Sequence, residues 1–169
     1  LRIGRSIDAR EHLAVLKERL ASGDLKDAPA SKDEPDRKPL DASLINILTA
    51  RSLLGSNDFE EAATLVAAMV GFDMTTRQFS SDAAASAATE AYLMLGAILE
   101  EKLNDKEAAS RVLDRLIRDQ KQDVQAWLAR SSWYRQHGNL DAAEADINEA
   151  IALEPDNVNG IFAGFELAL

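Results

Sequence analysis

An internal repeat constrains the fold of this 169-residue chain more than any other feature. Two segments align when one is shifted by 35 residues, namely 90–99 with 104–108 and 125–134 with 139–143. The aligned pairs are Tyr92 with Trp127, Gly96 with Ser131, Leu99 with Tyr134, Ala108 with Ala143, Val112 with Ile147, and Leu116 with Ile151. Self-similarity at this period indicates stacked copies of one supersecondary unit.

The pattern within each copy predicts two helices joined by a turn. Apolar residues three or four apart line one face of the second helix, and they are Leu140, Ala143, Ile147, Ala150 and Ile151. Gly138 supplies the turn, because glycine readily takes the left-handed conformation that ends a helix. Pro155 ends the second helix, because proline has no amide hydrogen to donate. Small residues at Ala108 and Ala143 are expected to let the paired helices approach closely.

These residues resemble the tetratricopeptide repeat, a helix–turn–helix unit of about 34 residues. Residues 124–157 match the family's preferred positions best, through Trp127, Tyr134, Gly138, Ala143, Ala150, Leu153 and Pro155. Residues 89–122 match through Tyr92, Leu95, Gly96, Ala108 and Leu116, and residues 43–76 through Ala50, Leu53, Phe59, Ala62 and Val66. The resemblance implies an all-α fold, a right-handed α-solenoid of antiparallel helix pairs.

The chain departs from the family pattern in two places. Arg130 stands where leucine is usual and Trp133 where a small residue is usual. Because they lie three apart on one helix, either the guanidinium lies near the indole face or the helix pair is repacked locally. Residues 71–88 form an insertion, in which Ser81 or Asp82 is expected to cap a helix that runs to about Leu103.

The sequence predicts three parts, which are a helix within 1–22, a flexible loop at 23–40 and a solenoid at 41–169. Gly4 and Ala9 have the spacing of Gly138 and Ala143, so residues 4–22, with Leu13, Leu16 and Leu20, read as the second helix of an earlier repeat. The loop holds three of the four prolines and dense mixed charge, and is either a plain linker or a regulatory or partner-binding segment. Residues 158–169 read as a lone first helix, either part of a longer array or a hydrophobic docking element.

The charge of the chain argues against nucleic-acid binding. The net charge is −10, with a balance of +1 in residues 1–40 and −11 in residues 41–169. Such a surface repels phosphate backbones and favours a basic partner, although it is also explained by solubility alone. The chain has no cysteine, which excludes disulfides and thiolate metal sites and leaves the compartment undecided. No apolar run reaches the roughly 18–20 residues that cross a bilayer.

No residue pattern predicts catalysis, so the chain is interpreted as a non-enzyme without cofactor or metal. His12 and His137 have no ligand at metal-site spacing and are interpreted as surface residues. Glu100, Glu101, Glu144 and Asp146 are expected on polar faces, where burial cannot shift their pKa values toward acid–base work. Glycine-rich phosphate loops need a strand before the helix, and no strand pattern is present.

The resemblance implies that the first helices of the repeats line a concave groove that binds a peptide or helix. The groove positions are Ile47, Arg51 and Leu54, then Glu90, Leu93, Ala97 and Glu100, then Gln125, Leu128, Ser132 and Arg135. One subfamily grips the terminal carboxylates of chaperones with lysines and asparagines, and those residues are missing here. The expected partner is an amphipathic segment with apolar and basic residues.

Three functional hypotheses follow. The first is a non-catalytic scaffold or adaptor that binds another protein in the groove. The second is a self-associating structural segment, a homo-oligomer formed through unpaired terminal helices. The third is a regulatory arm of a larger chain that contains an enzyme.

Overall fold

The computed structural model describes residues 11–16, 18–19, 22, 42–80 and 88–167. The helices are α2 (Ala42–Gly55), α3 (Phe59–Val70), α4 (Thr89–Ala97), α5 (Lys106–Asp119), α6 (Val124–Gln136), α7 (Leu140–Leu153) and α8 (Val158–Leu167). A π-helical turn, η1 (Ile98–Lys102), continues α4, and residues 11–16 and 18–19 are also helical. The predicted loop at 23–40 and residues 1–10 of the predicted first helix lie outside the described residues.

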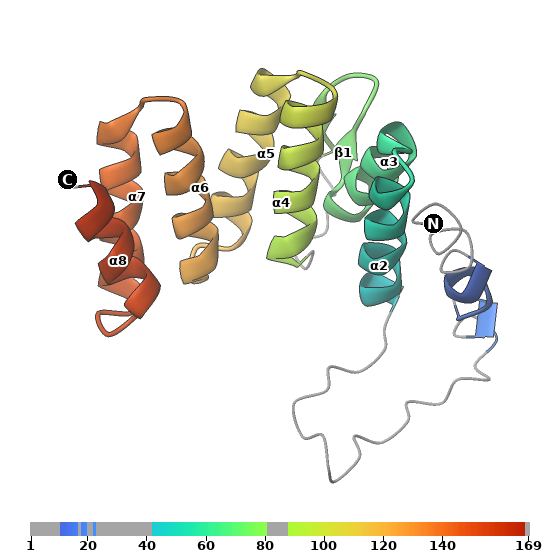
Figure 1. The fold of residues 1–169 in the computed structure, drawn as a ribbon, viewed down its shortest axis with the longest axis horizontal. Helices are drawn as coiled ribbons and strands as arrows, with labels where there is room; N and C mark the ends of the chain where they lie inside the picture. The colour runs from blue at the N-terminus through green and yellow to red at the C-terminus, as the bar shows by residue number, and fades with distance from the viewer. Residues whose placement is uncertain (1–10, 17, 20–21, 23–41, 81–87, 168–169) are drawn as a thin grey trace, which may run out of the picture.

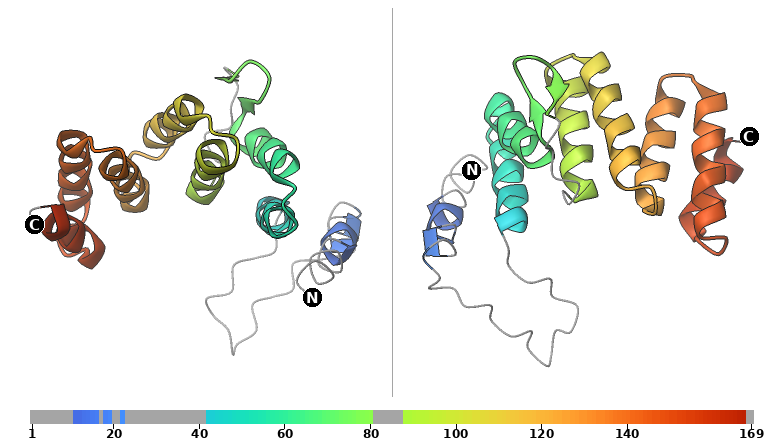
Figure 2. Two further views of the ribbon diagram at one scale, coloured as in Figure 1. Left: turned by 45° about the horizontal axis from the view of Figure 1, so that its top comes forward. Right: turned by 180° about the vertical axis from the view of Figure 1, so that it is seen from behind.

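The helices pair and stack into a solenoid, as the repeat predicts (Figure 1). α2 packs on α3, α4 on α5, and α6 on α7, while α8 packs on α7. Seen nearly along the helices, α2, α4, α6 and α8 follow the concave side of an arc, and α3, α5 and α7 its convex side (Figure 2, left). The first helices of the pairs therefore share one side of the molecule.

The helix starts recur with the period of the repeat. The Asp105 side chain caps α5 and the Asn139 side chain caps α7, each accepting from the amide three residues later, at 3.0 and 3.3 Å. Asp123 and Asn157 cap α6 and α8, each accepting from the amide two residues later, at 2.9 and 3.1 Å. Each pair is separated by 34 positions, so the same local chemistry starts equivalent helices.

The predicted helix ends within 124–157 are confirmed. Gly138 has φ 73°, in the left-handed region, and α7 ends at Leu153, two residues before Pro155. Ala143, Ile147 and Ala150 are buried on α7 as expected. Leu140, at the first position of α7, was expected on the same face and is instead exposed, because it lies at the tip beside the turn.

The core runs continuously from α2 to α6. Its largest fully buried side chains are Tyr92, Ile45, Leu95, Leu99, Leu116, Val66, Val70 and Val112. Alanines at 62, 108 and 143 are fully buried where the helices of a pair meet. Small side chains at these positions let the helix axes approach, as the sequence predicted.

The insertion between α3 and α4 contains a β-hairpin that the sequence did not predict. β1 (Phe72–Asp73) pairs antiparallel with β2 (Gln78–Phe79), with Phe72 opposite Phe79 and their rings 5.0 Å apart, edge to face. The Asp73 carboxylate accepts from two amides of the turn, and Arg115 of α5 lies 5.0 Å from the Phe79 ring. The hairpin thus attaches the first helix pair to the second. Strands of two residues are too short to show an alternating pattern.

The expected start of the following helix is wrong. Ser81 and Asp82 lie outside the described residues, but Ala88 has extended backbone (φ −63°, ψ 142°) and α4 begins at Thr89. The Thr89 hydroxyl donates to the Asp123 carboxylate across to the next helix pair, which fixes the start of α4. The expected end near Leu103 agrees with the end of η1 at Lys102.

Among the described helices, none is both long and apolar enough to cross a membrane.

Candidate functional site

One predicted groove residue is wrong, because it lies in the core. Ile47 is 3% exposed and packs with Ala50 and Leu53 of the same helix in the continuous core. A side chain so enclosed cannot contact a partner unless the helix pair opens. Ile47 therefore contributes to folding, and the accessible concave positions of α2 are Arg51 and Leu54.

The other predicted positions reach the surface. The exposed ones are Arg51, Glu90, Ala97, Gln125 and Arg135, and the half-buried ones are Leu54, Leu93, Glu100, Leu128 and Ser132. They belong to α2, α4, η1 and α6, the elements on the concave side of the arc in Figure 2. Leu93 and Leu128 place apolar side chains at equivalent positions of successive first helices.

Polar bridges join each first helix to the next along this side. Arg51 of α2 pairs with Glu90 of α4, and Arg135 of α6 pairs with Glu166 of α8 at 2.6 Å. Between them, Glu100 of η1 bonds to α6. Four of these five residues had been predicted as groove positions, and the structure shows that they contact one another or the neighbouring first helix.

Glu100 is the centre of the middle bridge. Its Oε2 accepts from Trp133 Nε1 at 2.6 Å, and its Oε1 lies 2.6 Å from His137 Nε2. His137 Nδ1 lies 2.7 Å from the Trp133 carbonyl oxygen, and the two rings are 4.2 Å apart. His137 was interpreted as a surface residue and is exposed, and its contact with Glu100 also helps to hold η1 against α6. Trp133, which stands where the repeat usually has a small residue, was the sequence feature that could have indicated this contact.

The π-helical turn places Glu100 in this bridge. The Leu103 amide donates to the Ile98 carbonyl at 3.0 Å, a bond across five residues instead of four. The wider turn rotates the residues that follow it relative to a regular α-helix. Sequence periodicity does not reveal such a turn. Leu95 and Leu99 are four residues apart, a spacing that is equally typical of a regular α-helix, and the turn adds only one residue.

Arg130 forms a largely buried ion pair, which differs from the first of the two alternatives, a guanidinium near the Trp133 indole. Its Nε and Nη2 donate to both carboxylate oxygens of Asp146 on α7, at 2.8 and 2.7 Å, and its Nη1 donates to Asp114 at 3.0 Å. The guanidinium lies 5.5 Å from the rings of Trp127 and Tyr134. The alternative, a locally repacked helix pair, describes this arrangement.

Asp146 was expected on a polar face and is instead buried. Its side chain is 4% exposed and that of Arg130 is 16% exposed. The hydrogen bonds that Arg130 donates to Asp146 raise the pKa of Arg130 above its usual range, so the guanidinium stays charged. The ion pair therefore has a structural role, and Arg130 occupies the hydrogen-bond acceptors of the Asp146 carboxylate.

A second polar network lies near the start of α4, at the other end of this helix from the Glu100 bridge. The Asp119 carboxylate accepts from the Tyr92 hydroxyl at 2.8 Å and from Arg115 Nε at 2.5 Å. Burial opposes ionisation of Asp119, but the hydrogen bonds from Arg115 and Tyr92 outweigh it and lower its pKa. Burial and the neighbouring carboxylate raise the pKa of Tyr92, which remains a hydrogen-bond donor.

Within the described part of the chain, no three histidine, cysteine or acidic side chains gather as a metal site would require. Glu101 and Glu144 are exposed, and Glu100 and Asp146 are engaged in the contacts above. The concave side therefore offers apolar and ion-paired contacts to a ligand.

Residues 124–157, which are α6, α7 and their caps, match the family model of the tetratricopeptide repeat. No curated protein matches the chain. The matched segment carries the caps Asn139 and Asn157, the left-handed Gly138 and the buried Ala143 and Ala150. Together, the match and the stacked helix pairs show a helical-repeat solenoid that contains a tetratricopeptide repeat at residues 124–157.

Proposed function

We propose that the chain is a non-catalytic scaffold whose concave side binds a peptide or amphipathic helix of another protein. Tetratricopeptide repeats generally mediate protein–protein interactions. The observation that carries the proposal is that Leu93 and Leu128 are half-buried at equivalent positions of α4 and α6, two helices of the concave side (Figure 2). A partner that covers both side chains gains hydrophobic free energy without unfolding either helix pair.

The charges beside these leucines favour a partner with basic as well as apolar residues. Glu90 and Glu166 remain about half exposed in their pairs with Arg51 and Arg135. Exposed ion pairs contribute little to stability, so a lysine or arginine of a partner can replace the chain's own arginine at small cost. The balance of −11 over residues 41–169 attracts such a partner from a distance.

A peptide display selection tests this proposal. The full chain is immobilised and a random library of peptides about 16 residues long, enough for four helical turns, is selected against it. The same selection is run against the double variant Leu93→Ala/Leu128→Ala. The control is Leu65→Ala/Leu103→Ala, which removes two leucines of similar burial from α3 and from the end of η1. Circular dichroism verifies that both variants keep their helix content.

The proposal predicts that the parent chain and the control enrich peptides with apolar residues three or four apart and with basic residues between them. The concave variant should bind these peptides at least tenfold more weakly, because it loses apolar area at two contacts. Equal binding by all three proteins would place the binding surface elsewhere. Enrichment of acidic peptides would contradict the proposed partner chemistry.

A second candidate function, self-association, is favoured by a different observation, the exposed apolar side chains of α8.

A further inference from the structure

α8 presents a contiguous apolar face to solvent. Its exposed large apolar residues are Val158, Ile161, Phe162 and Phe165, with the two phenylalanines 63% and 62% exposed. Positions three and four apart lie on one side of a helix, so these side chains form one patch. Exposed apolar patches of this kind mark interaction surfaces.

The equivalent face of α6 shows what kind of element covers such a patch. α6 and α8 begin with equivalent caps, Asp123 and Asn157, so Phe165 occupies the position of Ser131. Ser131 is 4% exposed in α6, which packs chiefly against α7, the second helix of its pair. Among the described residues, no second helix covers α8 in the same way. The part of the patch around Phe165 is therefore the surface that the second helix of a repeat would bury, whereas Phe162 occupies the position of the accessible Leu128.

The chain contains a further segment with the pattern of a second helix. When Gly4 and Ala9 are aligned with Gly138 and Ala143, Leu13 takes the place of the buried Ile147. Residues 11–16 and 18–19 of this segment are helical, and they lie at the opposite end of the solenoid from α8 (Figure 1). The two elements do not touch within one copy in this arrangement, so a contact between them joins two copies of the chain.

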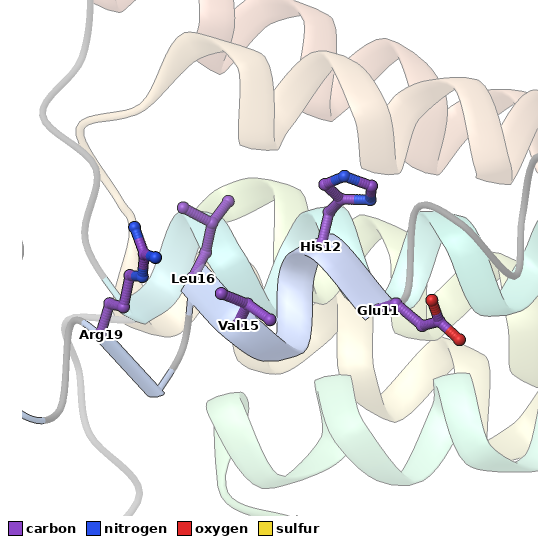
Figure 3. Close-up of a pocket in the computed structure, with 5 residues that line it drawn as sticks. All are labelled: Glu11, His12, Val15, Leu16 and Arg19. Carbon is purple, nitrogen blue, oxygen red and sulfur yellow. The ribbon is translucent and has the colours of Figure 1, made fainter.

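The N-terminal helix has a hollow beside it that exposes apolar area. The hollow is lined by Glu11, His12, Val15, Leu16 and Arg19, all on one helix (Figure 3). Val15 is 48% exposed there, so apolar area remains uncovered in the hollow. Polar and charged side chains around an apolar centre are typical of a protein interface.

The net charges of the two ends of the chain determine which ends of two copies attract each other. Residues 1–20 contain five basic and three acidic side chains, a balance of +2, whereas residues 140–169 contain seven acidic side chains and no lysine or arginine, a balance of −7. The C-terminal end of one copy therefore attracts the N-terminal end of another. Two C-terminal ends repel each other, which disfavours pairing of α8 with α8.

We propose that α8 of one copy docks against the N-terminal helix of a second copy, so that copies associate head to tail. Phe165 and Ile161 of the first copy cover Val15 and Leu16 of the second, and the N-terminal helix packs on α8 as α7 packs on α6. Such a contact is heterologous, so it continues from copy to copy unless the rotation closes a ring. It leaves the concave side of α4 and α6 uncovered and does not depend on the proposed peptide binding.

Two variants that each damage one end test the proposal. Val15→Glu disrupts the N-terminal surface and Phe165→Glu disrupts the α8 surface, and both side chains are already exposed, so folding should persist. The matched controls are Ala14→Glu and Asn159→Glu, which add the same charge to an exposed neighbouring position of the same helix. Solution mass is measured by light scattering over a wide concentration range at low salt, and circular dichroism verifies the fold of each variant.

The proposal predicts that the mass of the parent chain and of both controls rises with concentration, and less so at high salt because the end charges are screened. Each disruptive variant alone should stay at the mass of one chain. Mixing the two should give the mass of two chains and no more, because only one intact surface of each kind remains. A single-chain mass for the parent at every concentration would overturn the proposal. Persistent association of Val15→Glu alone would overturn it in favour of pairing between two α8 helices.

Discussion

Removing the buried carboxylate of Asp146 should destabilise the chain strongly. Arg130 would keep its hydrogen bond to Asp114 and its contacts with Trp127 and Tyr134, but it would lose both bonds to Asp146. Breaking a buried pair by removing one partner costs about 3–5 kcal/mol. Because Arg130 is 16% exposed and keeps a partner, we expect Asp146→Ala to lower the free energy of unfolding by about 3 kcal/mol, the lower end of that range.

A double-mutant cycle separates the ion pair from simple loss of packing. Arg130→Leu alone leaves Asp146 buried without its main partner and should also cost about 3 kcal/mol. The double variant Arg130→Leu/Asp146→Ala removes both charges and places leucine against the core. Replacing a buried pair with apolar residues is often neutral. The double variant should therefore be less destabilised than either single variant, with a coupling free energy above about 2 kcal/mol.

Equilibrium urea denaturation, followed by helical circular dichroism, measures these free energies. The control is Glu149→Ala, which removes an exposed carboxylate from the same helix and should change stability by less than about 0.5 kcal/mol. If Asp146→Ala behaves like the control, the carboxylate does not hold Arg130 as described. If the two single-variant losses simply add in the double variant, the pair is not coupled and the reasoning is wrong.

Three further predictions concern caps, pH and a turn. Asp105→Ala should cost about 2 kcal/mol and Asn139→Ala about 1 kcal/mol in urea denaturation, because Asp105 caps its helix and also pairs with an arginine of the insertion at 2.9 Å. Asp119 has a lowered pKa in the folded chain, so it contributes to the free energy of unfolding at pH values above its unfolded pKa near 4. This contribution is lost as pH falls through the lower pKa of the folded chain. Asp119→Asn should flatten the acid dependence of stability in this range, and an unchanged slope would refute the assignment. Gly138→Ala should lower the free energy of unfolding by about 1 kcal/mol, because alanine is strained at a φ of 73°. A steric clash does not contribute, since nothing lies within 4 Å of the added carbon.

The parts of the fold that the sequence predicted depend on local signals. The turn at Gly138, the end of α7 before Pro155 and the buried alanines 108 and 143 each follow from one residue's own conformational preference or size. Repetition of these signals predicted the stacking of helix pairs. The predicted groove positions other than Ile47 are exposed or half-buried on helices of the concave side, and their role in binding stays a prediction.

The failures have a common physical cause, which is contact between residues far apart in the chain. Asp146 is charged and was expected at the surface, but its position is decided by Arg130, 16 residues earlier. The hairpin forms because Phe72 and Phe79 pack together beside Arg115 of a later helix. Ile47 has helical spacing compatible with either face, and only the packing around it shows that it is buried. Sequence periodicity carries no information on such partners.

Amide hydrogen exchange in the presence of a selected peptide tests the central claim, that the concave side of the solenoid binds another protein. The account predicts that saturating peptide slows exchange in α4 and α6, around Leu93 and Leu128, and leaves the convex helices α3, α5 and α7 unchanged. Protection confined to the convex helices, or binding without any change in α4 and α6, would contradict the account.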